Sequence, residues 1–498
     1  MLSLNRAVAC CLFALAVEAA IPSNMLNRAC QPKSQRAKLI RDAYLYAYDG
    51  YKEFAFGHDE LLPVSESHSD SRNGWGASII DSLDTMLIMG LHDEYEEALG
   101  FVEELDFSTA IGNSKGFETN IRYLGGLLAA YDLKPDPILL SKAIEVAELT
   151  LVPLFVSTKT PSGRSVKVPL TYMDVNNGNS VNTNTINLAE FGSYLMEFTR
   201  LSQVSGDPKY KQLVDDLADA IFEQPSAIPG IYPMDWTVSP FRANEKSYIS
   251  VGGGADSYYE YLIKNYLLDN KKKPELLKMW QTSVESMDDY MLTPTAEDPE
   301  IQFVPAVSDN KLKYYSQELS CFWPGNIVLG ATQTQDPSKQ NKYIKFARTF
   351  LRSCVEVWKD TKTGIAPEAW SFNPIDNRVQ DKLTKLINSK HKQKRARTFS
   401  IINSIYDLRP GDKQYQDLAW NMFLNIDRYA KAKAGYSRMK DVDQIQTNLD
   451  DFQESFFFAE TLKYLYLMFV DKDCISLNDF VFNTEAHPFK LPEAIKYQ

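Results

Sequence analysis

Most of the chain between residues 35 and 470 places its apolar residues at helical spacing. Three runs show this well, and each follows an aspartate that can cap a helix: Asp93, Asp207 and Asp412. In the second run Pro208 also suits a first helical turn. The spacing predicts amphipathic helices rather than strands, with one face formed by Tyr95, Ala98, Leu99, Val102 and Leu105, by Leu213, Val214, Leu217 and Ile221, and by Tyr415, Leu418 and Phe423.

The pattern changes near the C-terminus. Residues 480–489 alternate apolar and polar positions, which predicts a short strand or hairpin. No linker rich in Ser, Gly or Pro divides the 498 residues, so we expect one large domain over residues 35–490. Residues 382–397 are strongly basic and are interpreted as a solvated loop, in which Lys394-Arg395 could instead be a dibasic processing site.

The N-terminus has the pattern of a secretory signal peptide. Arg6 precedes an apolar run from Ala7 to Val17, and the small residues Ala19 and Ala20 suit cleavage, so residues 1–20 are the predicted peptide. A signal anchor is the alternative, but the run is short for a membrane span, and we expect no stable membrane insertion. The protein would then lie in the secretory pathway (endoplasmic reticulum or Golgi lumen) or be secreted.

Four cysteines remain after the predicted peptide: Cys30, Cys321, Cys354 and Cys474. An oxidising compartment permits disulfides, but the spacing alone does not pair four cysteines. The formal net charge of −12 and the pI of about 5.1 argue against nucleic acid as a partner, because backbone phosphates need a basic surface.

Short acidic and aromatic motifs follow one another along most of the chain. They are His58-Asp59-Glu60-Leu61, Ile80-Asp81-Ser82-Leu83-Asp84-Thr85, Phe117-Glu118-Thr119-Asn120-Ile121-Arg122, Leu188-Ala189-Glu190, Asp256-Ser257-Tyr258-Tyr259-Glu260, Pro367-Glu368, Gln453-Glu454-Ser455-Phe456, Ala459-Glu460-Thr461 and Phe482-Asn483-Thr484-Glu485-Ala486-His487-Pro488. The order of these motifs resembles that of the class I α-1,2-mannosidases, glycoside hydrolase family 47.

The resemblance implies an all-α fold, a single (α/α)7 toroid whose barrel is plugged by a short C-terminal β-hairpin. It implies inverting, calcium-dependent hydrolysis of terminal α-1,2-linked mannose from high-mannose N-glycans on glycoproteins. The protein is expected to be a monomer.

The resemblance also assigns residues to the site. Glu118 corresponds to the proposed acid and Asp256 to a second catalytic carboxylate, since glycoside hydrolysis needs one carboxylic acid and one carboxylate. Thr484 would bind Ca²⁺ through its hydroxyl and carbonyl, with surrounding carboxylates, Glu485 among them, acting through water. Cys321 and Cys354 match the family's disulfide. The residues expected to contact substrate are Asp84, Arg122, Glu190, Glu260, Glu368 and Glu454.

One family motif is missing. Where the family has Arg-Pro-Glu and then Glu-Ser, Ser400 and Asn403 occupy the positions of the two glutamates, and residues 371–399 do not resemble the family. A serine hydroxyl does not replace a carboxylate as base at neutral pH without help. Three interpretations follow: a catalytically impaired mannose-binding relative acting as a lectin in glycoprotein quality control, a slow enzyme with Asp256 as base, or a gene-model error such as an unspliced segment.

Overall fold

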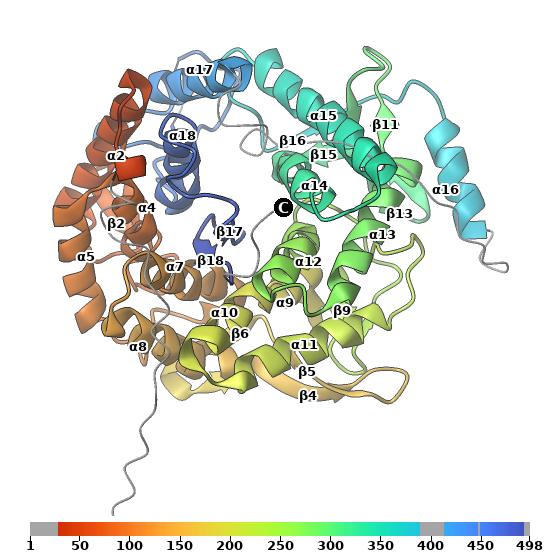
Figure 1. Ribbon diagram of the computed structural model, residues 1–498, viewed down its shortest axis with the longest axis horizontal. Coiled ribbons are helices and arrows are strands. Elements are labelled where there is room, and N and C mark those ends of the chain that lie inside the picture. Colours follow the sequence, from red (N-terminus) through yellow and green to blue (C-terminus); the bar gives the residue numbers. More distant parts are fainter. Residues whose placement is uncertain (1–27, 389–412, 447–448, 493–498) are drawn as a thin grey trace, which may run out of the picture.

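The helices form a ring of two concentric layers (Figure 1). The computed structural model describes residues 28–388, 413–446 and 449–492. From α2 to α15 inner and outer helices alternate along the chain, and neighbouring helices pack in pairs that bury their apolar faces between the layers. The inner layer contains α4 (Leu83–Met89), α7 (Gly125–Leu133), α10 (Leu195–Ser205), α12 (Asp256–Leu268), α14 (Trp323–Ala331) and α18 (Lys463–Leu467). The outer layer contains α2 (Gln35–Phe54), α5 (His92–Glu104), α8 (Pro137–Val146), α11 (Pro208–Phe222), α13 (Pro274–Tyr290), α15 (Pro337–Asp360) and α17 (Lys413–Tyr429).

The N-terminal and C-terminal helices of the described chain meet in this ring. The C-terminal α18 packs against both α2 and α4 from the N-terminal part. Short helical segments extend three of the inner helices: α6 (Gly116–Glu118) and η1 (Thr119–Leu124) lead into α7, η5 (Glu318–Phe322) leads into α14, and η6 (Phe457–Leu462) leads into α18. These extensions carry Glu118, which is expected in the site, and also Glu318 and Glu460.

Local sequence explains where the outer helices begin. Asp207 caps α11, because its Oδ1 accepts the Lys209 N–H at 3.0 Å, and Pro208 is the first helical residue, as predicted. The predicted cap at Asp93 is wrong, because α5 begins one residue earlier, at His92, after the buried Leu91. Gly90, with φ +68°, ends α4 so abruptly that the chain re-enters a helix without room for a polar cap. Asp412 lies outside the described residues.

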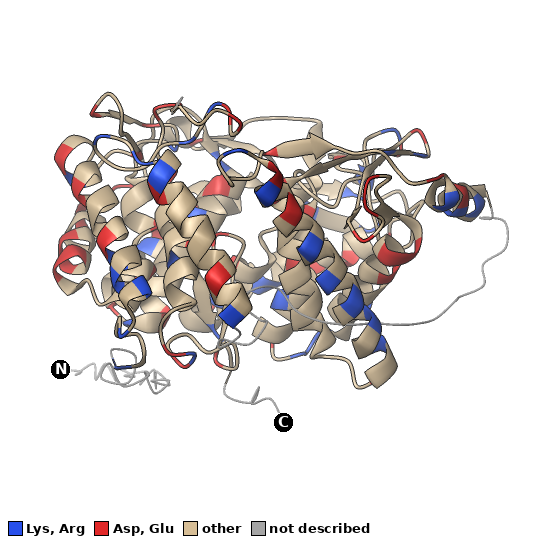
Figure 2. Cartoon of the chain, turned by 90° about the horizontal axis from the view of Figure 1, so that it is seen from above, with Lys and Arg blue, Asp and Glu red and all other residues tan. Residues whose placement is uncertain are grey.

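Small antiparallel sheets connect the helices, and Figure 2 shows the ring from the side with acidic and basic residues interspersed along it. One prediction fails in this periphery: residues 382–388 of the basic segment belong to the helix α16 (Arg378–Asn388) rather than to a solvated loop, and Leu383 of this helix is fully buried. Residues 389–397 of the segment lie outside the described residues. The strands are β1 (Glu60–Leu62) with β2 (Ser67–Ser69); β3 (Ser114–Lys115) with β6 (Tyr172–Asp174) and β7 (Asn179–Ser180); β4 (Phe155–Lys159) with β5 (Ser165–Pro169); β8 (Thr185–Asn187) with β9 (Asp235–Thr237) and β10 (Arg242–Ala243); β11 (Thr293–Pro294) with β12 (Gln302–Phe303); β13 (Ala306–Ser308) with β14 (Lys311–Lys313); and β15 (Tyr315–Gln317) with β16 (Ala369–Ser371).

The C-terminal segment forms the predicted hairpin. β17 (Phe480–Phe482) pairs antiparallel with β18 (Pro488–Lys490), and Figure 1 shows both strands inside the ring of helices. β17 contacts α12 and β18 contacts α7, so most of the hairpin is buried on both faces. This burial explains why the polar positions of the alternation lie in the turn rather than on an exposed face.

Two disulfides join distant parts of the fold. Cys321 and Cys354 are bonded, with Cα atoms 6.1 Å apart, which confirms the predicted pair and ties η5 to α15. Cys30 and Cys474, which the sequence left unpaired, form the second bond with Cα atoms 4.6 Å apart. Over the described ranges, no helix combines the length and the apolarity needed to cross a bilayer.

Candidate active site

An acidic cavity of about 520 Å³ lies where the inner helices meet the C-terminal hairpin. Asp256 and Glu260 lie one turn apart at the start of α12, Glu460 comes from η6, and Thr484 comes from the hairpin turn. Glu318 adds a fourth carboxylate, whereas Lys264 is the only lysine or arginine among the described residues that line the cavity. Since Lys264 forms an ion pair with Glu260, the other carboxylates have no cationic side chain in the cavity itself.

Burial raises the pKa values of Asp256, Glu460 and Glu318, and the negative charge of Glu260 adds to the effect at Asp256 and Glu460. Burial raises the pKa of Asp256 to about 7, and the negative charge of Glu260 adds to the effect. Burial also raises the pKa of Glu460 to about 7, where the charge of Arg122 lowers it and that of Glu260 raises it further. The side-chain atoms around Thr484 that could bind a metal ion are oxygens, and the negative charges of the carboxylates repel one another. The cavity therefore suits a hard divalent cation such as Ca²⁺.

The hairpin turn that presents Thr484 is held from below by Asn483. The Asn483 side chain donates to the Ile121 carbonyl at 3.0 Å and to Glu197 Oε1 at 2.9 Å, while its Oδ1 accepts the backbone N–H of Glu485 and of His487. The backbone N–H of Thr484 donates to the Tyr261 hydroxyl at 3.2 Å. This network fixes the turn and leaves the Thr484 side chain toward the cavity.

Glu118, at the end of α6, lies in a separate group of charges. Its Oε2 is 2.9 Å from Arg122 Nε and 3.2 Å from Arg72 Nη1. Burial alone would raise the pKa of Glu118, but the positive charges of Arg122, Arg72 and Lys115 outweigh it, so the pKa is lowered. Glu454 joins this group through Arg72, at 3.7 Å.

Arg122 connects the two acidic groups. It forms a short ion pair with Glu485, the neighbour of Thr484, and lies 3.2 Å from Asp81 as well as beside Glu118. The charges of Glu118 and Glu460 both raise the pKa of Glu485 after its burial, so these carboxylates lie within electrostatic range of one another.

Asp84 is fully buried beneath the hairpin. Lys463 Nζ is 2.7 Å from Asp84 Oδ2 and also donates to the Ala486 carbonyl at 2.7 Å. His487 bridges Asp84 and Asp81, with 3.2 Å on each side. Asp84 therefore contacts other protein groups that hold the turn, and the prediction that it contacts substrate stays a prediction.

The remaining predicted residues lie further out. Glu190 forms an ion pair with Lys115 at 2.8 Å, next to the Glu118 group. Glu368 is exposed just before β16 and does not line the cavity in the described part of the chain; Glu318, whose backbone N–H donates to the Glu368 carbonyl at 2.9 Å, lines it instead. Ser400 and Asn403 lie outside the described residues.

Sequence reasoning gave no role to Glu460, Glu318 or Arg72. Glu460 stands within one of the ordered motifs, so its sequence position was noticed, but only the ring brings it next to Asp256. Glu318 and Arg72 had no comparable signal. Glu318 reaches the cavity as the first residue of η5, which leads into α14, and Arg72 reaches Glu118 from the turn after β2.

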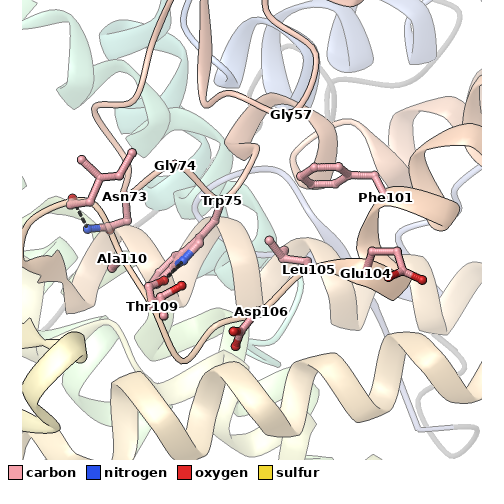
Figure 3. A pocket seen from close by; sticks show the side chains of 11 residues that line it. Gly57, Asn73, Gly74, Trp75, Phe101, Glu104, Leu105, Asp106, Thr109 and Ala110 are labelled. Atoms are coloured by element: carbon pink, nitrogen blue, oxygen red, sulfur yellow. Dashed lines mark hydrogen bonds between the residues drawn. The ribbon is translucent and has the colours of Figure 1, made fainter.

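A second cavity, also about 520 Å³, lies at the end of α5 (Figure 3). It is bounded by the end of α5, with Phe101 and Glu104, and by the loop that carries Asp106 and Thr109. The Trp75 indole forms part of its wall and donates to the Thr109 carbonyl at 2.7 Å. Of the described residues predicted for the active site, none lines this second cavity.

Comparison with known proteins supplies independent evidence. The profile of the family described as "Glycosyl hydrolase family 47" matches residues 43–491. A mannosyl-oligosaccharide alpha-1,2-mannosidase 1B of Emericella nidulans is 32% identical over 95% of this chain and 96% of its own length. The enzyme of the same name from Aspergillus oryzae is 31% identical, with 92% of each protein covered. The solved structure of an alpha-1,2-mannosidase from Trichoderma reesei superposes with a TM-score of 0.79 at 31% identity, covering 93% of this chain and all of that one.

Proposed function

Because the chain belongs to glycosyl hydrolase family 47, we propose that it is an α-1,2-mannosidase that hydrolyses terminal α-1,2-linked mannose on high-mannose N-glycans. The family and the mainly helical fold that the sequence predicted are thereby confirmed. The observation that carries the activity is the convergence of Asp256, Glu260, Glu460 and Thr484 on one cavity.

We propose Glu118 and Asp256 as the two catalytic carboxylates of an inverting reaction. One carboxylic acid gives its proton to the glycosidic oxygen as the C–O bond breaks. The other carboxylate takes a proton from the water that attacks the anomeric carbon, and such carboxyl groups lie about 6.5–9.5 Å apart in inverting enzymes. That separation stays a prediction for this pair.

The pKa shifts of the two carboxylates favour roles opposite to those implied by the resemblance, with Glu118 as the base and Asp256 as the acid. Two arginines keep the pKa of Glu118 low, which suits the base, whereas burial raises the pKa of Asp256 to about 7, which suits the acid. α-Mannosyl fluoride distinguishes the two assignments, because its fluoride leaves without protonation. If Asp256 is the acid, Asp256→Asn should retain turnover of the fluoride and lose turnover of the glycan, whereas Glu118→Gln should lose both. The reverse result would restore Glu118 as the acid.

Members of this family depend on calcium, and we propose that Thr484 holds the ion through its hydroxyl and carbonyl oxygens. Glu260, Glu460 and Glu485 would orient the water that completes the coordination shell. When bound, the ion offsets the repulsion among these acids and helps orient sugar hydroxyls. The protein's own part is to fix the Thr484 turn through Asn483 and to place Arg122 between the two acidic groups.

The finer features of the fold and surroundings belong to the same proposal. We propose the full (α/α)7 count, closure of the barrel by the β17–β18 hairpin, and glycan contacts by Arg122, Glu190, Glu260, Glu368 and Glu454. Asp84 would act from beneath, by holding the turn. We also propose that residues 1–20 are a signal peptide and that the protein is a monomer. The two disulfides support a location in the secretory pathway, because disulfides persist in an oxidising compartment.

The test is incubation with a nine-mannose N-glycan in calcium and in EGTA. Loss of mannose in calcium, with an inverted anomer by NMR and no loss in EGTA, is the expected result. The second candidate, a lectin, is favoured by Ser400 and Asn403 at the family's glutamate positions. Calcium-dependent glycan binding without any release of mannose would establish the lectin and refute hydrolysis.

A further inference from the structure

Two histidines and an aspartate lie close together outside the ring's centre, where the chain leaves α2 and enters the β1–β2 hairpin. Ligand-capable atoms of His58, His68 and Asp70 all lie within 4.8 Å of one another. His58 Nδ1 is 3.0 Å from Asp70 Oδ2, and the two imidazole rings stack with centroids 3.5 Å apart. The proposed hydrolysis uses none of these three side chains.

The backbone under this cluster is well anchored. His68 stands opposite Leu61 in the β1–β2 register, so its position follows from the hairpin. The His58 carbonyl accepts the Tyr51 hydroxyl at 2.6 Å, which fixes the chain just after α2. Asp70 immediately follows β2. The three side chains are therefore presented together by two fixed segments rather than by one loose loop.

We propose that His58, His68 and Asp70 bind a divalent first-row transition metal ion, for which Zn²⁺ is the probe. Two imidazoles and one carboxylate suit Zn²⁺, Ni²⁺ or Cu²⁺, whereas Ca²⁺ prefers an all-oxygen shell. The site is thus chemically distinct from the acidic cavity. Water would complete the coordination shell, because His68 is exposed.

Binding requires one rearrangement. The rings lie 14° from parallel, so the nitrogen lone pairs run side by side instead of converging on one point. Zinc–nitrogen bonds of about 2.0–2.1 Å need convergence, which a turn of the exposed His68 ring about its terminal torsion provides. The hydrogen bond between His58 and Asp70 would be exchanged for bonds to the metal.

The experiment is calorimetric titration of ZnCl₂ into the full-length chain, made without a histidine tag and kept in excess calcium. We expect one zinc per chain for the parent protein and affinity weaker by on the order of tenfold or more for His68→Gln. His92→Gln is the matched control, since His92 is also exposed but lies at the start of α5, outside the cluster. Its titration should equal that of the parent.

A second variant, Asp70→Asn, should weaken zinc binding while circular dichroism shows that both variants keep the parent's helical signal. Equal zinc titrations for the parent and His68→Gln, or no zinc heat from the parent, would overturn the site. No turnover is measured, so this result is independent of the mannosidase proposal.

Discussion

Replacing Lys463 with methionine tests how the hairpin turn is held. The Lys463 and Asp84 side chains are both fully buried, and the ammonium lies 2.7 Å from the carboxylate and 2.7 Å from the Ala486 carbonyl. Methionine fills a similar volume but removes the charge and both hydrogen bonds. A buried carboxylate and a buried carbonyl then lose their partner.

The expected loss is large. Removing one partner of a buried ion pair costs about 3–5 kcal/mol, because the other charge stays buried. An unpaired buried carbonyl adds about 1–3 kcal/mol. His487, 3.2 Å from the same Asp84 oxygen, offsets part of this, so we expect a net loss of about 3–5 kcal/mol in the free energy of unfolding.

The loss should also depend on pH. His487 has its pKa raised, chiefly by the charge of Asp84 against the opposing effect of burial, while the pKa of Asp84 is lowered. A raised histidine pKa contributes stability that is complete below the unfolded pKa and disappears as pH rises through the folded pKa. In Lys463→Met, His487 is the remaining cation next to Asp84, so the gap between variant and parent should widen as the pH rises through that value.

Urea unfolding followed by circular dichroism, with calcium kept constant, measures both effects. Lys359→Met is the matched control, since Lys359 is an exposed lysine paired with Glu356 and should matter little. If Lys463→Met lost less than about 1 kcal/mol, the same as a surface lysine, the argument that the pair holds the turn would be refuted.

Three further predictions concern the site and the disulfides. Ser400→Glu with Asn403→Glu should raise the rate of mannose release by about 10²–10⁴-fold if these positions, rather than Glu118, supply the base; an unchanged rate in a glycan assay would reject that alignment and leave Glu118 as the proposed base. EGTA should lower the melting temperature as well as the activity, because the acids around Thr484 lose their counter-charge; a calorimetric scan with an unmoved transition would contradict a calcium site there. Replacing Cys30 and Cys474 by alanine should cost about 2 kcal/mol more than replacing the other cysteine pair, because the sequence separation is 444 instead of 33, and equal urea midpoints would contradict this.

Short sequence patterns predicted the features that depend only on residues close together in the chain, such as a helix start and a hairpin. Asp207 and Pro208 marked the start of α11, and the alternation at residues 480–489 marked the hairpin. At Asp93 the same rule failed, since a glycine stop left no room for a polar cap. The ordered motifs gave the family, and with it the Cys321–Cys354 bond and the residues Asp256, Glu260 and Thr484 around one cavity.

The contacts that the sequence did not predict form between segments that come together only when the ring of helices closes. Asp84 and Lys463 are 379 residues apart, and the sequence around either residue does not predict that the two form an ion pair. Glu318 lines the cavity and Glu368 is exposed, although the two are backbone hydrogen-bond partners just beyond the β15–β16 pair. Such choices depend on the packing of whole helices and loops, which no pattern of single residues encodes.

The Cys30–Cys474 bond makes almost the entire described chain a covalent circle. A protease that cuts once between these residues opens the circle but releases no fragment. Cleavage after Lys394-Arg395, should it occur, would leave an N-terminal and a C-terminal piece that still migrate together until a reductant is added. A nicked population would therefore be invisible on a non-reducing gel and would separate into two bands only after reduction.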